Sequence, residues 1–247
     1  MNFGDYLAEI LYEALFSGRM DWIDGQIWLI GSVISDNSIQ SALSAGYPRI
    51  VYWGCGMREP VKLSPRLRAA AIFRGVRGPL TRTVLGLPPD TPIGDPGLLL
   101  PRFYLPAPAP EYEYRTLCMR HVHTAVPDAD LLKKTGAELV VTPWIVPDRG
   151  SCRRLIDAIA AAGFVLTASL HGAIVAYAYG TPFAFLRADR IDVPFKWADF
   201  AKSIGFECEF VTNVNQGIRF YEQNSKAAKV ELTLDSLLAA APLQGHS

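Results

Sequence analysis

The fold is decided by the stretch Gly163-Phe-Val-Leu-Thr-Ala-Ser-Leu-His-Gly-Ala-Ile-Val-Ala-Tyr-Ala-Tyr-Gly180. Its first part, residues 163–168, is a short apolar run that predicts a strand. Residues 173–179 predict a helix that ends at Gly180, in the position that favours glycine after a helix. Between them lie Ser169, Leu170, His171 and Gly172. A strand that runs directly into a helix is the repeating unit of a parallel α/β sheet.

The same unit recurs along the whole chain. Strands are predicted at residues 26–30, 49–53, 69–73, 115–119, 138–142, 163–168 and 182–186. Helices are predicted at residues 6–17, 36–45, 78–85, 129–135, 153–162, 173–179, 197–204 and 219–240. Alternation of this kind predicts parallel sheets with right-handed crossovers in both halves of the chain.

The segment 101–110 has four prolines and predicts an extended linker between two domains. We therefore expect an N-terminal Rossmann-like domain at residues 1–105 and a second one at 112–215, with a C-terminal helix and tail at 216–247. Two such sheets that face each other form a cleft at the carboxyl ends of their strands, where α/β folds bind ligands.

Composition excludes several classes of function for the 247-residue chain. Its 24 basic and 24 acidic residues balance, so no overall charge attracts nucleic acid or an anionic membrane. The four cysteines form no Cys-x-x-Cys pair, which argues against a zinc site or disulfide framework and favours a reduced, cytoplasmic setting. The N-terminus does not resemble a signal peptide, and no apolar run reaches the roughly 18 residues of a membrane span. We therefore expect membrane association, if it occurs, to be peripheral.

Polar or glycine-containing segments follow most of the predicted strands. They are Gly31-Ser32, Gly54-Cys55-Gly56, Arg74-Gly75, Asp95-Pro96, Arg120-His121 and Ser169-Leu170-His171-Gly172. A strand-to-helix turn exposes backbone N–H groups and places an anion near a helix N-terminus. The alternative is that the glycines serve turn geometry alone, since Gly-x-Gly without a third glycine is a weak nucleotide-binding signal.

His171 is the main titratable candidate, as a general acid, a phosphate ligand or a buried structural histidine. A helix N-terminus lowers the pKa of a nearby histidine and a bound phosphate raises it again, which suits an acid that is charged only with substrate present. Among the arginines, Arg74, Arg77 and Arg120 lie at or just after strand ends and match carboxylate or phosphate geometry. Arg66 is assigned, like Arg68, to a solvated face.

Two further segments are open to a structural or a functional interpretation. Asn2 or Asp5 in Asn2-Phe3-Gly4-Asp5 can cap the helix that follows, a role that needs no further function. Asp95 before Pro96 can likewise be a simple turn residue.

Taken in order, these segments resemble the polysaccharide pyruvyltransferase family over roughly residues 2–205. The resemblance is carried by Asn2-Phe3-Gly4-Asp5, Gly31-Ser32-Val33-Ile34, Gly54-Cys55-Gly56, residues 74–81, Gly94-Asp95-Pro96-Gly97 and residues 169–176. Within the family, the chain looks most like the enzymes that ketalate bacterial exopolysaccharide, such as the succinoglycan pyruvyltransferases of rhizobia.

This resemblance implies a GT-B-like fold of two Rossmann-type domains, with phosphoenolpyruvate as donor substrate and a pyruvate ketal on a sugar as product. It implies that His171 is the active-site histidine, that Arg120 holds the anionic groups of the donor, and that Arg77 belongs to the arginine motif of the first domain. The hydroxyl base is expected to be Asp5 or Asp95. Arg74, Ser169, Gly172, Asn2 and Ser32 complete the expected substrate-binding set.

No metal or other cofactor is implied by these residues. The expected partners are phosphoenolpyruvate and a lipid-linked oligosaccharide or polysaccharide acceptor, with no nucleic acid. The expected location is the cytoplasm, with peripheral association at the inner face of the plasma membrane.

The chain departs from the family pattern at two points. Many members have arginine two residues before the histidine, where this chain has Ser169. Asn2-Phe3-Gly4-Asp5 normally follows a first strand, so we expect the first domain to lack that strand, because of a misplaced start or a truncated chain. Two alternatives stay open: a GT-B glycosyltransferase that uses a nucleotide sugar, which requires a ribose-binding carboxylate, and a non-catalytic member of a glycan biosynthesis complex.

Overall fold

The computed structural model describes residues 1–16, 25–189, 191–227, 230 and 232–242. The chain forms two compact units, and each is assembled from three segments. Unit 1 takes Met1–Ile10, Gly97–Asp192 and Phe206–Ala228, and unit 2 takes Leu11–Pro96, Val193–Gly205 and Lys229–Ser247. The expected domains at 1–105, 112–215 and 216–247 were continuous, so these units divide the chain differently.

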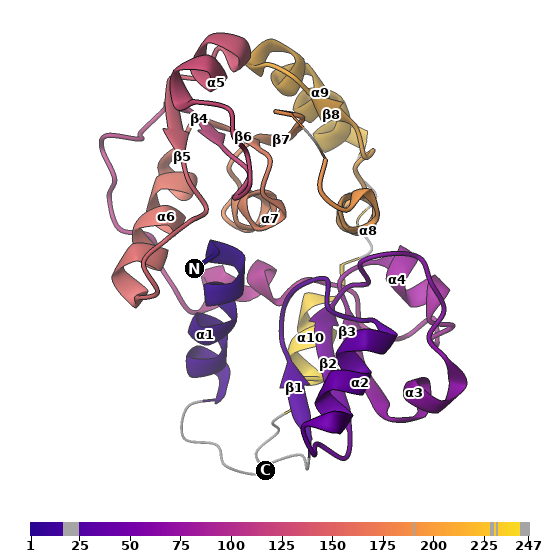
Figure 1. The fold of residues 1–247 in the computed structure, drawn as a ribbon. Helices are drawn as coiled ribbons and strands as arrows, with labels where there is room; N and C mark the ends of the chain where they lie inside the picture. The colour runs from indigo at the N-terminus through magenta and orange to yellow at the C-terminus, as the bar shows by residue number, and fades with distance from the viewer. Residues whose placement is uncertain (17–24, 190, 228–229, 231, 243–247) are drawn as a thin grey trace. The chain divides into compact units, whose positions relative to one another are not determined.

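Unit 1 is built on a five-stranded, fully parallel sheet with the order β5-β4-β6-β7-β8 (Figure 1). The strands are β4 (Thr116–Met119), β5 (Leu139–Val141), β6 (Phe164–Thr167), β7 (Phe183–Leu186) and β8 (Phe210–Val211). The first four confirm predicted strands. The two-residue β8 was not predicted, because two residues are too few to show a period.

The helices of unit 1 lie around this sheet (Figure 1). They are α5 (Asp128–Thr135), α6 (Arg149–Ala161), α7 (Leu170–Ala178) and α9 (Val214–Ala227). The first part of α1 (Phe3–Phe16) also belongs to unit 1 but does not lie on the sheet. Aromatic rings fill the space between β7 and α9, where Phe183 stacks on Phe206 with ring centroids 5.7 Å apart and Phe185 packs on Phe220. Buried aromatic area of this kind fixes α9 on the sheet.

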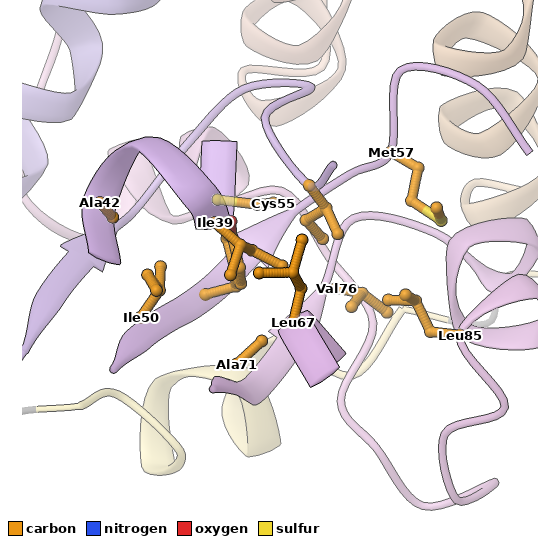
Figure 2. Close-up of a cluster of buried hydrophobic side chains, with 11 residues drawn as sticks. Ile39, Ala42, Ile50, Cys55, Met57, Leu67, Ala71, Val76 and Leu85 are labelled. Carbon is orange, nitrogen blue, oxygen red and sulfur yellow. The ribbon is translucent and has the colours of Figure 1, made fainter. Parts of the chain in front are cut away.

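Unit 2 has a three-stranded parallel sheet with the order β1-β2-β3. Its strands are β1 (Gln26–Trp28), β2 (Ile50–Cys55) and β3 (Ala71–Val76), and its helices are α2 (Asp36–Ser44), α3 (Pro65–Ala69), α4 (Pro79–Val84), α8 (Pro194–Ser203) and α10 (Leu234–Ala239). Every residue of β2 is buried, as expected for the central strand of a covered parallel sheet. Figure 2 shows the apolar cluster beside it, in which Ile39, Leu67 and Val76 meet. The two sheets confirm the predicted α/β class with two Rossmann-like parallel-sheet domains.

Three local expectations differ from the structure. The predicted helix at 219–240 is two helices, α9 and α10, and residues 230, 232 and 233 between them are not helical, while 228, 229 and 231 lie outside the described residues. Strand β3 continues to Val76 rather than ending at residue 73, so Arg74 lies within the strand. The predicted helix at 6–17 begins earlier, at Phe3, and its residue 17 lies outside the described residues.

The proline-rich segment 101–110 is not a free linker. A 3-10 helix, η1 (Pro96–Arg102), occupies its start. Farther along, the Tyr104 hydroxyl and the backbone N–H of Ala107 donate hydrogen bonds of 2.7 and 3.0 Å to Asp157, a buried residue of α6. Tyr179 also donates to the carbonyl of Tyr104. These contacts hold the segment against unit 1. They could not be predicted from the sequence, because they join residues that are far apart in the chain.

Candidate active site

The strand order of unit 1 creates a topological switch point between β4 and β6. From β4 the chain passes through α5 to β5 on one side, and then crosses back through α6 to β6 on the other side. Crossovers that diverge in this way leave a crevice at the carboxyl ends of the two strands, where open α/β sheets bind ligands. The residues that follow these ends are Arg120 and His121 after β4, and Ser169, Leu170 and His171 after β6.

His171 is the second residue of α7, in its first turn, and its side chain is half-buried. The backbone of Gly4 packs against the imidazole, since a Cβ atom built on Gly4 would overlap Nδ1 of His171. The structure therefore brings the segment Asn2-Phe3-Gly4-Asp5 to the predicted active-site histidine, across most of the sequence. Glycine at position 4 is explained by this close approach rather than by an unusual backbone angle.

The N-terminal segment is fixed by a short network of backbone contacts. Asn2 pairs with Trp144 in an antiparallel bridge, and the N–H of Phe3 donates to the carbonyl of Pro143 at 2.7 Å. The Asn2 side chain accepts a 3.1 Å hydrogen bond from the N–H of Gly4, so its predicted role as a helix cap is confirmed. Asp5 lies in the first turn of α1, where partial desolvation raises the pKa of its carboxyl and the N-terminal ammonium group opposes that rise.

Arg120 is held by the loop that follows it. One nitrogen of the guanidinium contacts the carboxylate of Asp128 at 2.6 Å, and the other donates to the carbonyl of Thr124 at 2.9 Å and to that of Val126 at 3.4 Å. Its side chain stays 25% exposed. Its partners show that the side chain orders the loop after β4, and its donor-binding role stays a prediction.

A second cluster of titratable side chains lies at the carboxyl end of this sheet, and the sequence analysis named only His121 of it, in the segment Arg120-His121. His121 Nε2 lies 3.8 Å from the carboxylate of Asp192, and its Nδ1 accepts a hydrogen bond from the N–H of His123. Thr124 donates a 2.8 Å hydrogen bond to Asp189. Asp189 and Asp192 follow β7, so the signal available in the sequence was a group of charged residues directly after a buried strand.

Ser169 and Gly172 have different structural settings. Ser169 is the residue before α7, and its hydroxyl makes no capping hydrogen bond to the helix. Gly172 is buried, and a Cβ atom there would overlap Met119 Sδ and lie 2.5 Å from Thr167 Oγ1. The glycine thus allows α7 to approach β4 and β6 closely. This packing explains glycine at position 172, and the expected approach of a ligand to its backbone stays a prediction.

In unit 2, Arg77 is fully buried at the end of β3. Its guanidinium donates a 2.9 Å hydrogen bond to the hydroxyl of Ser32, and its Nε lies 3.8 Å from the carboxylate of the equally buried Asp199. Desolvation raises the pKa of Asp199, although the charge of Arg77 and two hydrogen bonds from Thr81 act in the opposite direction. The structure therefore places Arg77 and Ser32 in an internal polar cluster, with Arg77 shielded from solvent.

Asp95 and Arg74 also belong to unit 2 but differ in exposure. Asp95 is fully buried near Cys55, where burial and the negative charge of Asp95 raise the pKa of the thiol. The turn before it is tight, since a Cβ atom on Gly54 would overlap the ring of Pro96. Arg74 is exposed in the middle of β3, away from the strand end where it was expected.

The predicted site residues are thus divided between the two units. Unit 1 contains Asn2, Asp5, Arg120, Ser169, His171 and Gly172, whereas unit 2 contains Ser32, Arg74, Arg77 and Asp95. Within the described ranges, no group of three or more His, Cys, Asp or Glu side chains is arranged to hold a metal ion. The switch point of unit 1, with a histidine at a helix N-terminus and a partly exposed arginine, is suited to an anionic ligand and to proton transfer.

Comparison with known proteins identifies the family of the chain. The family model described as polysaccharide pyruvyl transferase matches residues 33–190, which is more than half of the chain. The chain belongs to the polysaccharide pyruvyl transferase family. The match includes Arg120, Ser169 and His171, and it begins after Asn2 and Asp5.

The family assignment made from the sequence motifs is confirmed, and a curated relative from a glycan pathway supports it. Over 138 residues the chain is 29% identical to the succinoglycan biosynthesis protein ExoV of Rhizobium meliloti (strain 1021). The matched region covers 54% of this chain and 40% of that relative. In the described part of this family member, no helix is both long enough and apolar enough to span a bilayer.

Proposed function

We propose that this chain transfers a pyruvyl group from phosphoenolpyruvate to two hydroxyl groups of a sugar, forming a cyclic ketal and releasing phosphate. The acceptor is a sugar unit of an exopolysaccharide or of another cell-surface glycan. The observation that carries the proposal is the position of His171 at the switch point of unit 1, in a chain of this family. The role of ExoV in succinoglycan biosynthesis supports a glycan acceptor.

The proposed reaction adds one proton to the methylene carbon of the enol and forms two carbon–oxygen bonds at C2. Protonation makes C2 cationic, and a sugar hydroxyl attacks it while losing its proton to a base. The bond from C2 to the phosphate oxygen then breaks, phosphate leaves with the electron pair, and a second hydroxyl closes the ketal. The two sugar hydroxyls lose one proton each. One of these protons restores the acid that protonated the methylene carbon, and the other ends on the released phosphate.

His171 is proposed as the proton donor for the methylene carbon. Its position in the first turn of α7 places the imidazole beside a helix N-terminus, which favours the binding of an anionic donor substrate nearby. Arg120, whose side chain is 25% exposed, is proposed to attract the carboxylate or phosphate of phosphoenolpyruvate through its charge. The hydroxyl of Ser169, which makes no capping hydrogen bond to α7, is proposed as a further hydrogen-bond donor to the same substrate.

Asp5 is proposed as the base that accepts a hydroxyl proton. It lies one residue after Gly4, the residue that packs against His171, and its raised pKa makes its carboxylate a better proton acceptor. Asp95 is the less favoured candidate, because it is fully buried in unit 2. Arg77 is proposed to position Ser32 through their hydrogen bond. Arg74, which is exposed, is proposed to contribute to substrate binding.

We further propose that the protein acts in the cytoplasm on a lipid-linked oligosaccharide or on the polysaccharide itself, with peripheral association at the inner membrane face. In the proposed reaction, side chains of the chain itself transfer the protons and bind the two anionic groups of the donor, and no cofactor takes part. These catalytic roles follow from the residue types at the switch point.

The test is incubation with phosphoenolpyruvate and a panel of glucosides, galactosides and bacterial oligosaccharides, followed by phosphate release and by mass spectrometry of the acceptor. Phosphate release that depends on acceptor, with a matching gain in acceptor mass, is expected. His171→Ala should lower kcat by about 100-fold, which is typical for loss of a general acid. The control is His123→Ala, a histidine after β4 with no assigned role.

Three outcomes would count against the proposal. The absence of transfer to every acceptor would contradict the function itself. Full activity of His171→Ala would remove its catalytic assignment. Equal losses in His171→Ala and His123→Ala would show that any disturbance of this sheet edge has the same effect.

A further inference from the structure

Unit 1 has a pocket of 390 Å³ beside the edge strand β5, outside the group of residues assigned to the reaction. One wall comes from β5 and the segment that follows it, including Thr142, Trp144 and Val146, and the other comes from Ser151 and Arg154 of α6. A volume of this size lies in the range of small-molecule sites. The lining exposes polar and apolar groups in equal measure, which suits a ligand that has both hydroxyl and C–H groups.

Trp144 is the notable feature of this pocket because 61% of its surface is exposed. Large aromatic side chains are usually buried in folded proteins, and a tryptophan that faces solvent beside a pocket is typical of a binding surface. Val146, two residues later, is also 65% exposed. Together they place an apolar platform at the mouth of the pocket.

The segment that carries Trp144 is firmly held. The ammonium group of Met1 donates a 2.8 Å hydrogen bond to the carbonyl of Ile145, the N–H of Ile145 donates to Met1 at 2.9 Å, and Asn2 bridges Trp144 itself. A platform fixed in this way loses little conformational freedom when a ligand binds.

The same contacts connect the platform to the proposed proton donor. Asn2 pairs with Trp144, and Gly4, two residues later, packs against His171. A ligand that rests on Trp144 therefore lies beside the short segment that also forms part of the surroundings of His171. All of these residues belong to unit 1.

We propose that Trp144 and this pocket form the subsite that receives a pyranose ring of the acceptor glycan. The C–H groups on one face of a pyranose carry partial positive charge and match the negative face of an indole ring. The Thr142 hydroxyl and the Arg154 guanidinium, which donates a 2.8 Å hydrogen bond to Ser151, offer polar contacts to ring hydroxyls at the rim. This assignment rests on the proposed function, because it supplies the acceptor of that reaction.

Two other occupants fit the pocket less well. Phosphoenolpyruvate is small and multiply anionic, whereas the lining of this pocket has a single cationic side chain, Arg154. A peptide strand added to the edge of the sheet needs a row of free backbone groups, and β5 has only three residues, Leu139–Val141. The flat, exposed ring and the size of the pocket favour a sugar.

Kinetics of Trp144 variants test the subsite. Trp144→Ala and Trp144→Leu should raise the KM for the acceptor by about tenfold, with the KM for phosphoenolpyruvate and kcat at saturating acceptor nearly unchanged. Trp144→Phe keeps an aromatic face and should stay within about threefold of the native KM. Tyr114→Ala is the matched control, since Tyr114 is an 85% exposed aromatic of unit 1 that does not line this pocket. An unchanged acceptor KM in both Trp144→Ala and Trp144→Leu would overturn the proposal.

Direct binding separates this proposal from the reaction. The acceptor oligosaccharide should quench tryptophan fluorescence of the native protein saturably, and the quench should be lost in Trp144→Phe. If the native protein binds the oligosaccharide through Trp144 but transfers no pyruvyl group, the subsite stands and the proposed function fails. If it transfers pyruvyl groups and the Trp144 variants match it in both assays, the subsite is wrong and the function stands. Absence of any sugar-dependent quench, with quenching by an extended peptide, would assign the pocket to a protein partner and overturn the proposal.

Discussion

At the scale of single residues, the contact between Gly4 and His171 joins two motifs that are far apart in the sequence. His171 lies where a strand meets a helix, which the sequence pattern predicts directly. Gly4 has no unusual backbone angle, and its identity is explained only by the imidazole that occupies the space of a side chain. The orientation of the histidine therefore depends on the first turn of α1.

Gly4→Ala tests this dependence. The added methyl group should displace the imidazole of His171 and lower kcat by about 100-fold, the scale expected for a displacement of about 1 Å at a reacting group. The matched control is Gly150→Ala, which occupies the same second position of a helix, α6. A Cβ atom there lies 3.1 Å from Asp148 Oδ1 and 3.2 Å from Arg154 Nη1, which are the ends of side chains and belong to neither the backbone nor a ring.

Activity and thermal unfolding should be measured together for the two glycine variants. Alanine is favoured over glycine in a helix by about 1 kcal/mol, so Gly150→Ala should keep or raise the melting temperature and leave kcat unchanged. Native kcat in Gly4→Ala would show that the position of His171 does not depend on this contact.

At the scale of elements, α10 shows how a distant segment completes unit 2. The backbone carbonyl of Leu237 accepts a 2.7 Å hydrogen bond from the indole of Trp53 on β2. The Leu237 side chain is fully buried, and a Cβ atom on Gly75 of β3 would lie 2.5 Å from its Cδ1. The first turn of the helix is joined to unit 2 as well, since Thr233 accepts a hydrogen bond from Ile93.

Leu237→Ala should therefore destabilise unit 2 by about 2–5 kcal/mol, the range for truncation of a buried leucine. Leu238→Ala is the matched control, because the neighbouring leucine on the same helix is only half-buried and should cost clearly less. Urea unfolding followed by circular dichroism measures both. Equal shifts of the two midpoints would contradict the docking of α10 through Leu237.

At the scale of the whole molecule, the two units are interleaved along the chain. Unit 1 needs segments from the start, the middle and the region after residue 206, and unit 2 takes the parts between and after them. Helix α9 packs on β7 through Phe220, and the expected boundary at residue 215 would remove most of that helix. A cut at the proline-rich segment likewise removes contacts made by Tyr104 with Asp157.

A fragment of residues 112–215 should therefore lack a cooperative thermal transition, whereas a fragment of residues 97–228 should regain much of it. The physical reason is that the shorter piece exposes Phe183, Phe185 and their neighbours, which α9 covers in the full chain. Melting followed by near-ultraviolet circular dichroism distinguishes a packed core from a collapsed one. A cooperative transition of the 112–215 fragment at the temperature of the full chain would contradict this expectation.

The order of the elements and the family were determined by the sequence. Apolar runs followed by helical periods are local signals, so the strands from β1 to β7 and the helix α7 were predicted within about three residues of their observed bounds. The motif order also led to the polysaccharide pyruvyl transferase family. Exposure was not predictable in this way: Arg77 and Asp95 have the chemistry of site residues and are nevertheless fully buried.

What only the tertiary structure decided is which distant residues meet at the segment from Ser169 to Gly172. The N-terminal turn lies against His171, Gly172 serves packing, and Trp144 is fixed beside a pocket by contacts with residues 1 and 2. These relations depend on the strand order β5-β4-β6 and on long-range pairing. Local sequence patterns reflect local backbone preference and burial, and they contain no information on which two surfaces come into contact.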